Sequence, residues 1–328
     1  MSIKTFEMKN SNGMSLTVSN IGCAIITLKV PDKNGKFLDV VTGLDSAEDY
    51  AKDYAKLHPY FGVICGRVAN RIAYAKFTLD GKEYVVGANA APHHLHGGVP
   101  GFDRKVWTVE EASASKVVFS YFSPDGENGY PGNLTIRCTY ILTDYNTLRI
   151  EYHATTDTKT VCNVTNHSYF NLEGHTAKDI FSHEMQIFSD KITAVDENLI
   201  PTGELTDVTG TPYDFRETKL IGQDFKSVDG GYDHNYALRS PGVAAVVYSP
   251  KTGIEMTVKT DSPGLQFYAG NFLDGSVTGK GATYQKQSAF CLETQLFPDC
   301  VNQPKFPSPV VVAGKPQESY TEYAFAVR

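Results

Sequence analysis

Apolar residues recur at every second position over much of the chain, and this period constrains the fold more than any other feature. Across residues 134–142, Leu, Ile, Cys, Tyr and Leu alternate with polar or intervening residues, and the alternation resumes across 148–154 after the turn-like residues 143–147. Successive side chains of a β-strand point to opposite faces of the sheet. The pattern therefore predicts an antiparallel hairpin with one face buried and one face solvated.

Further hairpins follow from turn chemistry. The segments 77–79 and 82–85 flank Asp80-Gly81, a pair suited to a two-residue type I′ turn. A second turn is predicted at 250–253, with apolar residues on one face of the strand that follows, and the chain closes with a strand at about 320–327.

Helical pattern is scarce in comparison. The best case begins at Ser46, where Asp49 forms a weak capping box and Tyr50, Tyr54 and Leu57 follow at helical spacing. There is no internal repeat, charge run or low-complexity linker, and the Gly- and Pro-rich stretches 124–132 and 298–316 are predicted to be long connections. We therefore expect an all-β protein with few short helices, a large antiparallel β sandwich formed by residues 1–328 as a single domain.

Charge and cysteine usage exclude several classes of partner. The net charge of −7 and the pI of about 5.7 argue against nucleic acid and against an anionic membrane surface. No stretch approaches the roughly 18 consecutive apolar residues of a membrane-spanning helix. Six cysteines lack CxxC pairing, so we expect a reduced, cytoplasmic protein. For the assembly we expect a monomer or a weak dimer.

Glu293 directly follows the apolar run Ala289–Leu292. A carboxylate at the end of such a strand is poorly solvated, which raises its pKa unless hydrogen-bond donors compensate. The competing interpretation is a strand end that has reached solvent, and the local pattern taken alone favours it.

His167 stands between a β-rich run and an aromatic segment dense in Asn, over residues 161–171. Histidine is the side chain best suited to proton transfer near neutral pH, and the surrounding amides and hydroxyls are able to orient its ring. A hydrogen-bonded structural histidine explains the pattern equally well.

Histidines are also concentrated at residues 93–96, followed by a double glycine. His94 and His96 are predicted to lie on the same side of an extended chain. No Cys or carboxylate has the spacing to complete a metal site, so no metal is expected. The glycines instead indicate backbone that passes close to another group, with His96 facing the same space.

Two further segments carry polar residues that break the pattern. The run 66–72 contains Arg67 and Arg71 but lacks the glycines and the Lys-Ser/Thr of a phosphate loop. One arginine is interpreted as structural and the other as a clamp for hydroxyls or a carboxylate. Residues 230–235 form a glycine-hinged loop with Asp233 and a histidine, for which a side-chain-stabilised turn is the simpler interpretation.

Together, His, Asp, Arg, Asn and Glu beside aromatic residues are what a pocket for a neutral polyol requires. Carboxylate and amide groups hold neighbouring hydroxyls, and an aromatic face packs on a sugar ring. No hydrolase elbow, dinucleotide fingerprint or HExxH motif is present in the sequence.

Seven segments, in order, resemble the aldose 1-epimerase (galactose mutarotase) family over roughly residues 20–328. They are Gly66-Arg67-Val68-Ala69-Asn70-Arg71-Ile72, Leu95-His96-Gly97-Gly98 with Gly101-Phe102-Asp103 and Trp107, Thr165-Asn166-His167-Ser168-Tyr169-Phe170-Asn171-Leu172, Glu197-Asn198-Leu199-Ile200-Pro201-Thr202-Gly203, Gly231-Tyr232-Asp233-His234, Gln266-Phe267-Tyr268 with Gly270-Asn271, and Glu293-Thr294-Gln295 with Pro298-Asp299. The chain departs from the family's pattern at His93 and Cys300, and neither position carries an inferred catalytic role.

The resemblance implies a β-supersandwich of the galactose mutarotase type with an open cleft. It implies that Glu293 is the general base and His167 the general acid of a mutarotase, which interconverts the α and β anomers of free hexoses such as galactose and glucose without a cofactor or metal. It further implies that the sugar is held by Asn70, Arg71, His96, Asp233 and Gln266.

The implied reaction removes the proton of the C1 hydroxyl and protonates the ring oxygen, so that the ring opens, rotates about C1–C2 and closes on the other face. Three alternatives stay open. A hexose-6-phosphate 1-epimerase of the same fold requires a basic cluster, a non-catalytic sugar-binding protein requires loss of the base or the acid, and a glycosidase requires two carboxylates, for which Glu293 and Asp233 are available.

Overall fold

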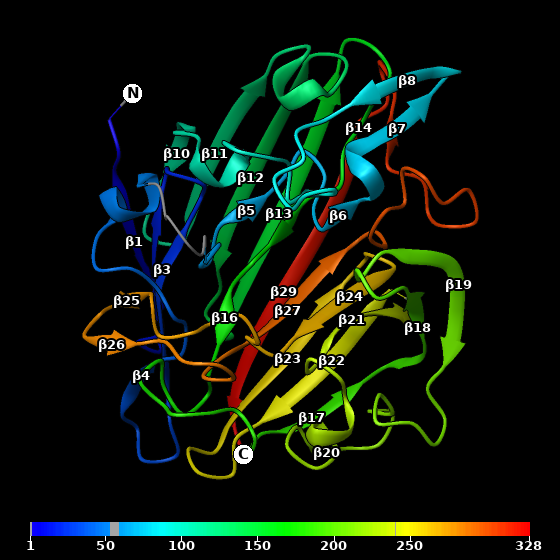
Figure 1. Cartoon of the computed structure of the whole chain (residues 1–328). Coiled ribbons are helices and arrows are strands. Elements are labelled where there is room, and N and C mark those ends of the chain that lie inside the picture. The colour runs from blue at the N-terminus through cyan, green and yellow to red at the C-terminus, as the bar shows by residue number, and fades with distance from the viewer. Residues whose placement is uncertain (1, 53–58, 240) are drawn as a thin grey trace.

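The computed structural model describes residues 2–52, 59–239 and 241–328, and nearly all of its regular structure is β-strand (Figure 1). One large sheet has nine strands, each antiparallel to its neighbours. In spatial order they are β10 (Thr108–Ala112), β11 (Lys116–Ser123), β12 (Leu134–Leu142), β13 (Thr147–Thr156), β29 (Gln317–Val327), β23 (Ile254–Thr260), β22 (Gly242–Tyr248), β17 (Glu184–Ile187) and β20 (Lys219–Leu220).

A second, six-stranded antiparallel sheet lies across the first. Its strands in spatial order are β16 (Tyr169–Phe170), β27 (Phe290–Gln295), β24 (Gly264–Tyr268), β21 (Asp233–Leu238), β18 (Ser189–Val195) and β19 (Pro201–Asp207). Side chains join the two sheets where β27 passes over β29: the hydroxyls of Thr294 and Thr321 are hydrogen-bonded, and the Tyr323 hydroxyl donates to the carbonyl of Leu292. This face-to-face packing confirms the predicted antiparallel β sandwich.

Smaller elements surround the two sheets. A four-stranded sheet contains β1 (Thr5–Lys9), β2 (Ser15–Ser19), β3 (Ile25–Pro31) and β4 (Phe37–Asp39). Two-stranded pairs are β5 (Ile64–Cys65) with β15 (Thr165–Asn166), β6 (Arg71–Ile72) with β9 (His94–Leu95), β7 (Lys76–Leu79) with β8 (Lys82–Val85), β14 (Thr160–Val161) with β28 (Val310–Val311), and β25 (Thr278–Gly279) with β26 (Ala282–Thr283). The short 3₁₀ helices are η1 (Ala47–Ala51), η2 (Ala73–Ala75), η3 (Phe102–Arg104), η4 (Glu127–Gly129) and η5 (Phe225–Ser227).

The predicted hairpins are confirmed. Strand β12 pairs with β13 in the expected register, β22 pairs with β23 around residues 250–253, and β7 pairs with β8. Asp80 and Gly81 have φ angles of 52° and 76°, the left-handed backbone that a type I′ turn requires at both positions. The predicted closing strand is β29, which lies at the centre of the nine-stranded sheet.

The helix predicted from Ser46 is wrong in type. The capping box between Ser46 and Asp49 is present, but it begins a five-residue 3₁₀ helix, η1, which ends at Ala51. Tyr54 and Leu57, which supplied the rest of the helical spacing, lie outside the described residues. No helix among the described residues is long and apolar enough to cross a membrane.

Strand β27 positions the cleft because its two faces differ. Phe290, Leu292 and Thr294 belong to the face packed on the nine-stranded sheet. The alternate residues Cys291, Glu293 and Gln295 therefore belong to the opposite face. All six cysteines, Cys291 among them, are buried free thiols.

Candidate active site

A cleft of about 230 Å³ opens on the face of the six-stranded sheet that bears Glu293. This volume is below the roughly 300–1,000 Å³ of pockets for drug-sized ligands, and it suits a smaller molecule. The lining residues are Tyr60, Asn70, Arg71, Asn89, Leu95, His96, His167, Tyr169, Asp233, Tyr268, Phe272 and Glu293. Six of the seven predicted site residues are among them.

Glu293 is buried in the interior of β27, with 2% of its surface exposed. The interpretation of this residue as a strand end in solvent is wrong, because strand β27 continues to Gln295 and all of its residues are buried. Burial raises the pKa of Glu293 well above its ordinary value, the negative charge of Asp233 raises it further, and Arg71 opposes the shift. Such a carboxylate in a cleft is typical of a functional site.

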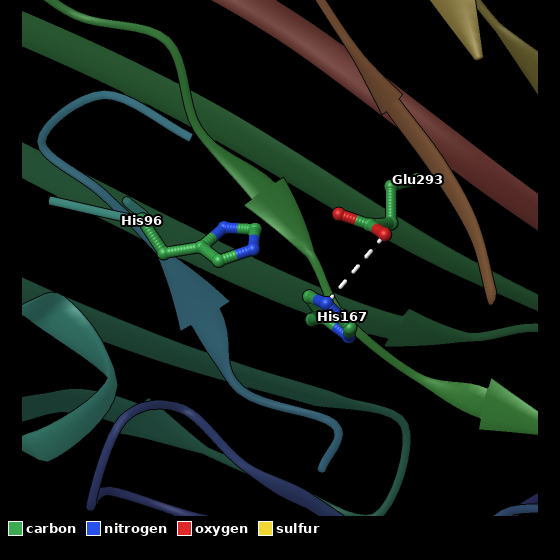
Figure 2. A group of neighbouring side chains, drawn as sticks. All are labelled: His96, His167 and Glu293. Carbon is green, nitrogen blue, oxygen red and sulfur yellow. Dashed lines mark ion pairs between the residues drawn. The ribbon is translucent and has the colours of Figure 1, made fainter. Parts of the chain in front are cut away.

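His167 lies between β15 and β16, and its Nε2 is 3.5 Å from Oε1 of Glu293. Figure 2 shows that Glu293, His167 and His96 converge from three separate segments of the chain. The His167 ring is stacked near Tyr60 and Tyr169, at centroid distances of 5.8 and 5.0 Å. The aromatic neighbours hold the imidazole so that Nε2 faces the carboxylate.

The other ring nitrogen of His167 has a sulfur neighbour. Its Nδ1 is 3.5 Å from Sγ of Cys291, two residues before Glu293 on the same face of β27. Burial raises the pKa of this thiol well above its ordinary value, so the thiol stays protonated. From the sequence Cys291 is interpreted only as an apolar strand residue, although its spacing of two residues from Glu293 places both side chains on one face of a strand.

His96 follows β9 and takes a left-handed backbone conformation with φ of 50°. Its Nδ1 accepts a hydrogen bond from the backbone N–H of Asn70 at 3.3 Å. In the neutral ring the proton therefore resides on Nε2. The prediction that His94 shares this side of the chain is wrong, because the backbone turns at His96. His94 instead contacts Tyr130 and the carbonyl of Gly87.

The two arginines of the segment 66–72 have separate environments. Arg71 lines the cleft and is half-buried. Arg67 is 1% exposed, and its guanidinium donates to the carbonyls of Pro131 and Gly132, both at 2.9 Å, and of Ser123 at 3.0 Å. The division into one structural arginine and one cleft arginine is thus supported, with Arg67 as the structural one.

Asp233 and Gln266 lie on the neighbouring strands β21 and β24. The Gln266 side-chain N–H donates to Oδ1 of Asp233 at 2.7 Å. Asp233 begins strand β21 and lines the cleft. Gln266 is 4% exposed and is bonded to the cleft residue Asp233, and its own contact with the sugar stays a prediction.

His96, His167 and Glu293 each place one possible ligand atom within 4.8 Å of the others. Three protein ligands are the number that an open zinc site uses. However, Nε2 of His167 and Oε1 of Glu293 face each other at 3.5 Å, and Nδ1 of His96 accepts a hydrogen bond from the backbone N–H of Asn70. The absence of a metal stays a prediction.

The aromatic residues of the cleft were not assigned a role from the sequence. Tyr169 and Tyr268 lie in segments that the sequence analysis singled out, and they pack edge to face at 5.9 Å. Phe272 stacks on Tyr268 at 6.1 Å and is 56% exposed at the cleft. Tyr60 gave no sequence signal, since the tertiary fold alone brings it to His96 and His167.

A larger groove of about 600 Å³ lies on the nine-stranded sheet. Its charged side chains neutralise one another, as Arg137 does with Glu110 at 2.7 Å and Arg149 with Glu151 at 2.7 Å. Exposed ion pairs of this kind are ordinary surface features. The smaller cleft, with its buried carboxylate, is the better candidate for chemistry.

Comparison with known proteins agrees with this geometry. The sequence profile of the family described as aldose 1-epimerase matches residues 4–324. The chain belongs to the aldose 1-epimerase family. It is 44% identical to a galactose mutarotase of Sus scrofa over 330 residues, covering 99% of this chain and 94% of the relative. It is 36% identical to an aldose 1-epimerase of Escherichia coli, covering 98% and 95%.

Solved structures of aldose 1-epimerase relatives share the fold. A crystal structure of an aldose epimerase homologue from C. elegans superimposes with a TM-score of 0.93 at 32% identity, covering 99% of both chains. The galactose 1-epimerase of Lactobacillus acidophilus superimposes with a TM-score of 0.84 at 26% identity, also covering 99% of both chains. These likenesses confirm the fold that the resemblance implied.

Proposed function

We propose that this aldose 1-epimerase interconverts the α and β anomers of free aldohexoses, with Glu293 as general base and His167 as general acid. The observation that carries the proposal is the buried pair itself: His167 Nε2 lies 3.5 Å from Glu293 Oε1 in the wall of a cleft of monosaccharide size. The activity of the full-length relatives supports the same reaction.

The two groups suit the proton transfers of mutarotation. The Glu293 carboxylate takes the proton of the C1 hydroxyl, while the His167 imidazolium gives its Nε2 proton to the ring oxygen. The C1–O5 bond breaks, the aldehyde rotates about C1–C2, and closure reverses both transfers. Each group contributes about 10²–10⁴ in rate. Because its pKa is raised, the Glu293 carboxylate binds the proton more strongly than an ordinary glutamate.

The remaining residues of the cleft are assigned to the sugar. Asp233 accepts hydrogen bonds from ring hydroxyls and is held in place by Gln266. Nε2 of His96 carries the proton of the neutral ring and donates to a sugar oxygen. Asn70 and Arg71 border the same space, and Arg71 stabilises negative charge that develops on a sugar oxygen.

A free sugar fits the cleft better than a sugar phosphate. Among the described residues that line the cleft, Arg71 is the single Arg or Lys. Arg67, the other basic residue of that segment, donates its guanidinium hydrogen bonds to buried carbonyls, so it is not available to bind a phosphate. A phosphate dianion normally requires several convergent cationic or backbone donors.

The test is polarimetry on freshly dissolved α-galactose, α-glucose and α-glucose 6-phosphate, with an aryl galactoside as a further substrate. The proposal expects rapid mutarotation of one or both free hexoses, weak or no acceleration for the phosphate, and no release of the aryl alcohol. Preference for glucose 6-phosphate favours the phosphosugar alternative. Release of the aryl group favours a glycosidase, and binding without turnover favours a silent sugar-binding protein.

We extend the proposal to the setting of the enzyme. The family profile covers nearly the whole chain, which supports residues 1–328 as one functional unit. Six buried free thiols are consistent with the reducing cytoplasm, and the net charge of −7 with partners other than nucleic acid. A monomer or weak dimer is the proposed assembly, which analytical ultracentrifugation tests.

A further inference from the structure

A group of buried polar atoms lies around Glu293 on strands β21, β24 and β27. The side-chain oxygen and nitrogen of Asn235 and of Gln295, together with Oε1 of Gln266 and Oε2 of Glu293, make no hydrogen bond with any protein group in the described residues. All four residues are at most 4% exposed. Six such atoms in one region require a physical explanation.

Strand pairing places these four side chains on one patch of one sheet face. Asn235 of β21 is opposite Gln266 of β24, and Gln266 is opposite Glu293 of β27. Gln295 lies two residues beyond Glu293 on the same strand, and so faces the same side. We call this patch of Asn235, Gln266, Glu293 and Gln295 the amide hollow.

Gly264 allows Asn235 and Phe297 to pack closely against the backbone of β24. It pairs with Gln295 and is two residues from Gln266 on the same face of β24. A Cβ at this position would lie 2.6 Å from Oδ1 of Asn235 and 2.9 Å from Cδ1 of Phe297. The glycine therefore leaves space for these two side chains. Phe297 packs on Phe306 and forms an apolar cover.

The polar atoms of the hollow must be paired in the working protein. A buried polar group without a partner costs about 1–3 kcal/mol, and six of them would consume most of the roughly 5–15 kcal/mol that stabilises a typical domain. Asn235 and Gln295 are not among the residues that line the cleft, so the sugar is not the partner of their amides. Buried water makes two to four hydrogen bonds and is the usual solution for a polar, enclosed space.

We propose that the amide hollow binds ordered water that donates hydrogen bonds to Oε2 of Glu293, and that Asn235 and Gln295 are positioning residues for the base. Amide oxygens and nitrogens orient the water so that its protons point to the carboxylate. The two carboxylate oxygens then have separate tasks: Oε1 faces His167 and the substrate, while Oε2 is solvated from the hollow. This inference rests on the proposed role of Glu293.

Water bound to Oε2 would stabilise the ionised form of Glu293. Burial and the charge of Asp233 both favour the protonated form of Glu293, which is inactive as a base. Water held by the amides favours the ionised form and keeps the base usable. The other titratable groups around Glu293, none of which is changed by the variants below, are Asp233, Arg71, His167, His96, Cys65, Cys291, Tyr169, Tyr268 and Tyr323.

The test compares Asn235→Leu and Gln295→Met, which keep side-chain size and remove the amide, with the control Gln186→Met on the distant strand β17. In both hollow variants the acid limb of the kcat/KM profile should move up by about one pH unit. Activity then falls about tenfold on that limb and returns to within about threefold of wild type at pH 9. The control should leave the profile unchanged.

A uniform loss of activity at every pH, or a lower melting temperature with an unmoved acid limb, overturns the inference. A high-resolution crystal structure of the wild-type protein provides a second test that needs no variant: water within 3.2 Å of Glu293 Oε2 and of either amide is expected, and a dry hollow contradicts it. Glu293→Gln separates the two proposals. If that variant stays active, the proposed base is wrong, whatever the hollow contains.

Discussion

Arg67 and Arg71 are four residues apart, and the structure predicts opposite consequences when each is replaced by Met. Arg67 is almost fully buried, and its guanidinium donates to the carbonyls of Pro131, Gly132, Ser123 and Pro124. It therefore joins the segment before β6 to the connection after β11. Arg67→Met removes all of these bonds at once, although the carbonyls of Pro131 and Pro124 keep their bonds from the Thr160 hydroxyl and the Glu127 N–H.

The expected loss is about 3–5 kcal/mol in the free energy of unfolding. A hydrogen bond to a charged group contributes about 1.5–3 kcal/mol, and an unpaired buried acceptor costs about 1–3 kcal/mol. The sum is offset because the buried charge, whose pKa is lowered by burial, no longer has to be desolvated. Arg71→Met should change stability by less than about 1 kcal/mol, since Arg71 is half-buried in an open cleft.

Urea unfolding followed by fluorescence measures both losses, because Trp107 is the single tryptophan and is fully buried. Activity should show the reverse order: kcat/KM falls at least tenfold in Arg71→Met, and Arg67→Met keeps most of its activity at low temperature without urea. A loss below 1 kcal/mol in Arg67→Met, with an unchanged dependence on urea, would refute the structural role.

Three further predictions concern the cleft. Between the ordinary Glu pKa of about 4.3 and the raised pKa of Glu293, the unfolded chain has released a proton that the folded protein retains, so the free energy of unfolding falls as pH rises. The Glu293→Gln variant should therefore have a higher melting temperature than wild type at pH 8 but not at pH 4, as measured by paired calorimetric scans. Asp233→Asn removes a charge that raises the pKa of Glu293, so the acid limb of kcat should move to lower pH while KM rises, and an upward move would contradict this electrostatic account. Gly97→Ala should abolish activity and destabilise the fold by several kcal/mol, because the backbone has φ of +86° and the new Cβ would lie 1.7 Å from the carbonyl oxygen of Gly66. The control Gly281→Ala has φ of +75° but open space around it, so it should cost only about 1 kcal/mol of backbone strain in the same urea assay.

Local features of the fold were predictable where a local cause determines them. The alternation in 134–142 and the Asp80-Gly81 turn fixed hairpins that the structure contains in the expected register. The helix at Ser46 was predicted in the wrong form, although its capping box is present. A short segment that packs one tyrosine has little to stabilise a longer helix.

The site itself depended on contacts between distant residues. Glu293 and His167 are 126 positions apart, and nothing in either segment alone predicts that they meet. The ordered motifs of the family supplied that information. The direction of the His96 side chain could not be predicted from the sequence, because it depends on the left-handed backbone of His96 after β9. The position of Gln266 could not be predicted either, because it depends on the pairing of β21 with β24. The amide hollow was equally hidden, since it arises from the register of three strands.

The central claim is that Glu293 and His167 together carry the proton transfers of mutarotation. The most direct measurement is the polarimetric rate of α-galactose anomerisation by wild type, Glu293→Gln and His167→Gln, with sugar binding followed by calorimetry. We predict a loss of at least about 100-fold in each variant, with measurable binding retained. A rate above one tenth of wild type in either variant, with the fold intact, would contradict it.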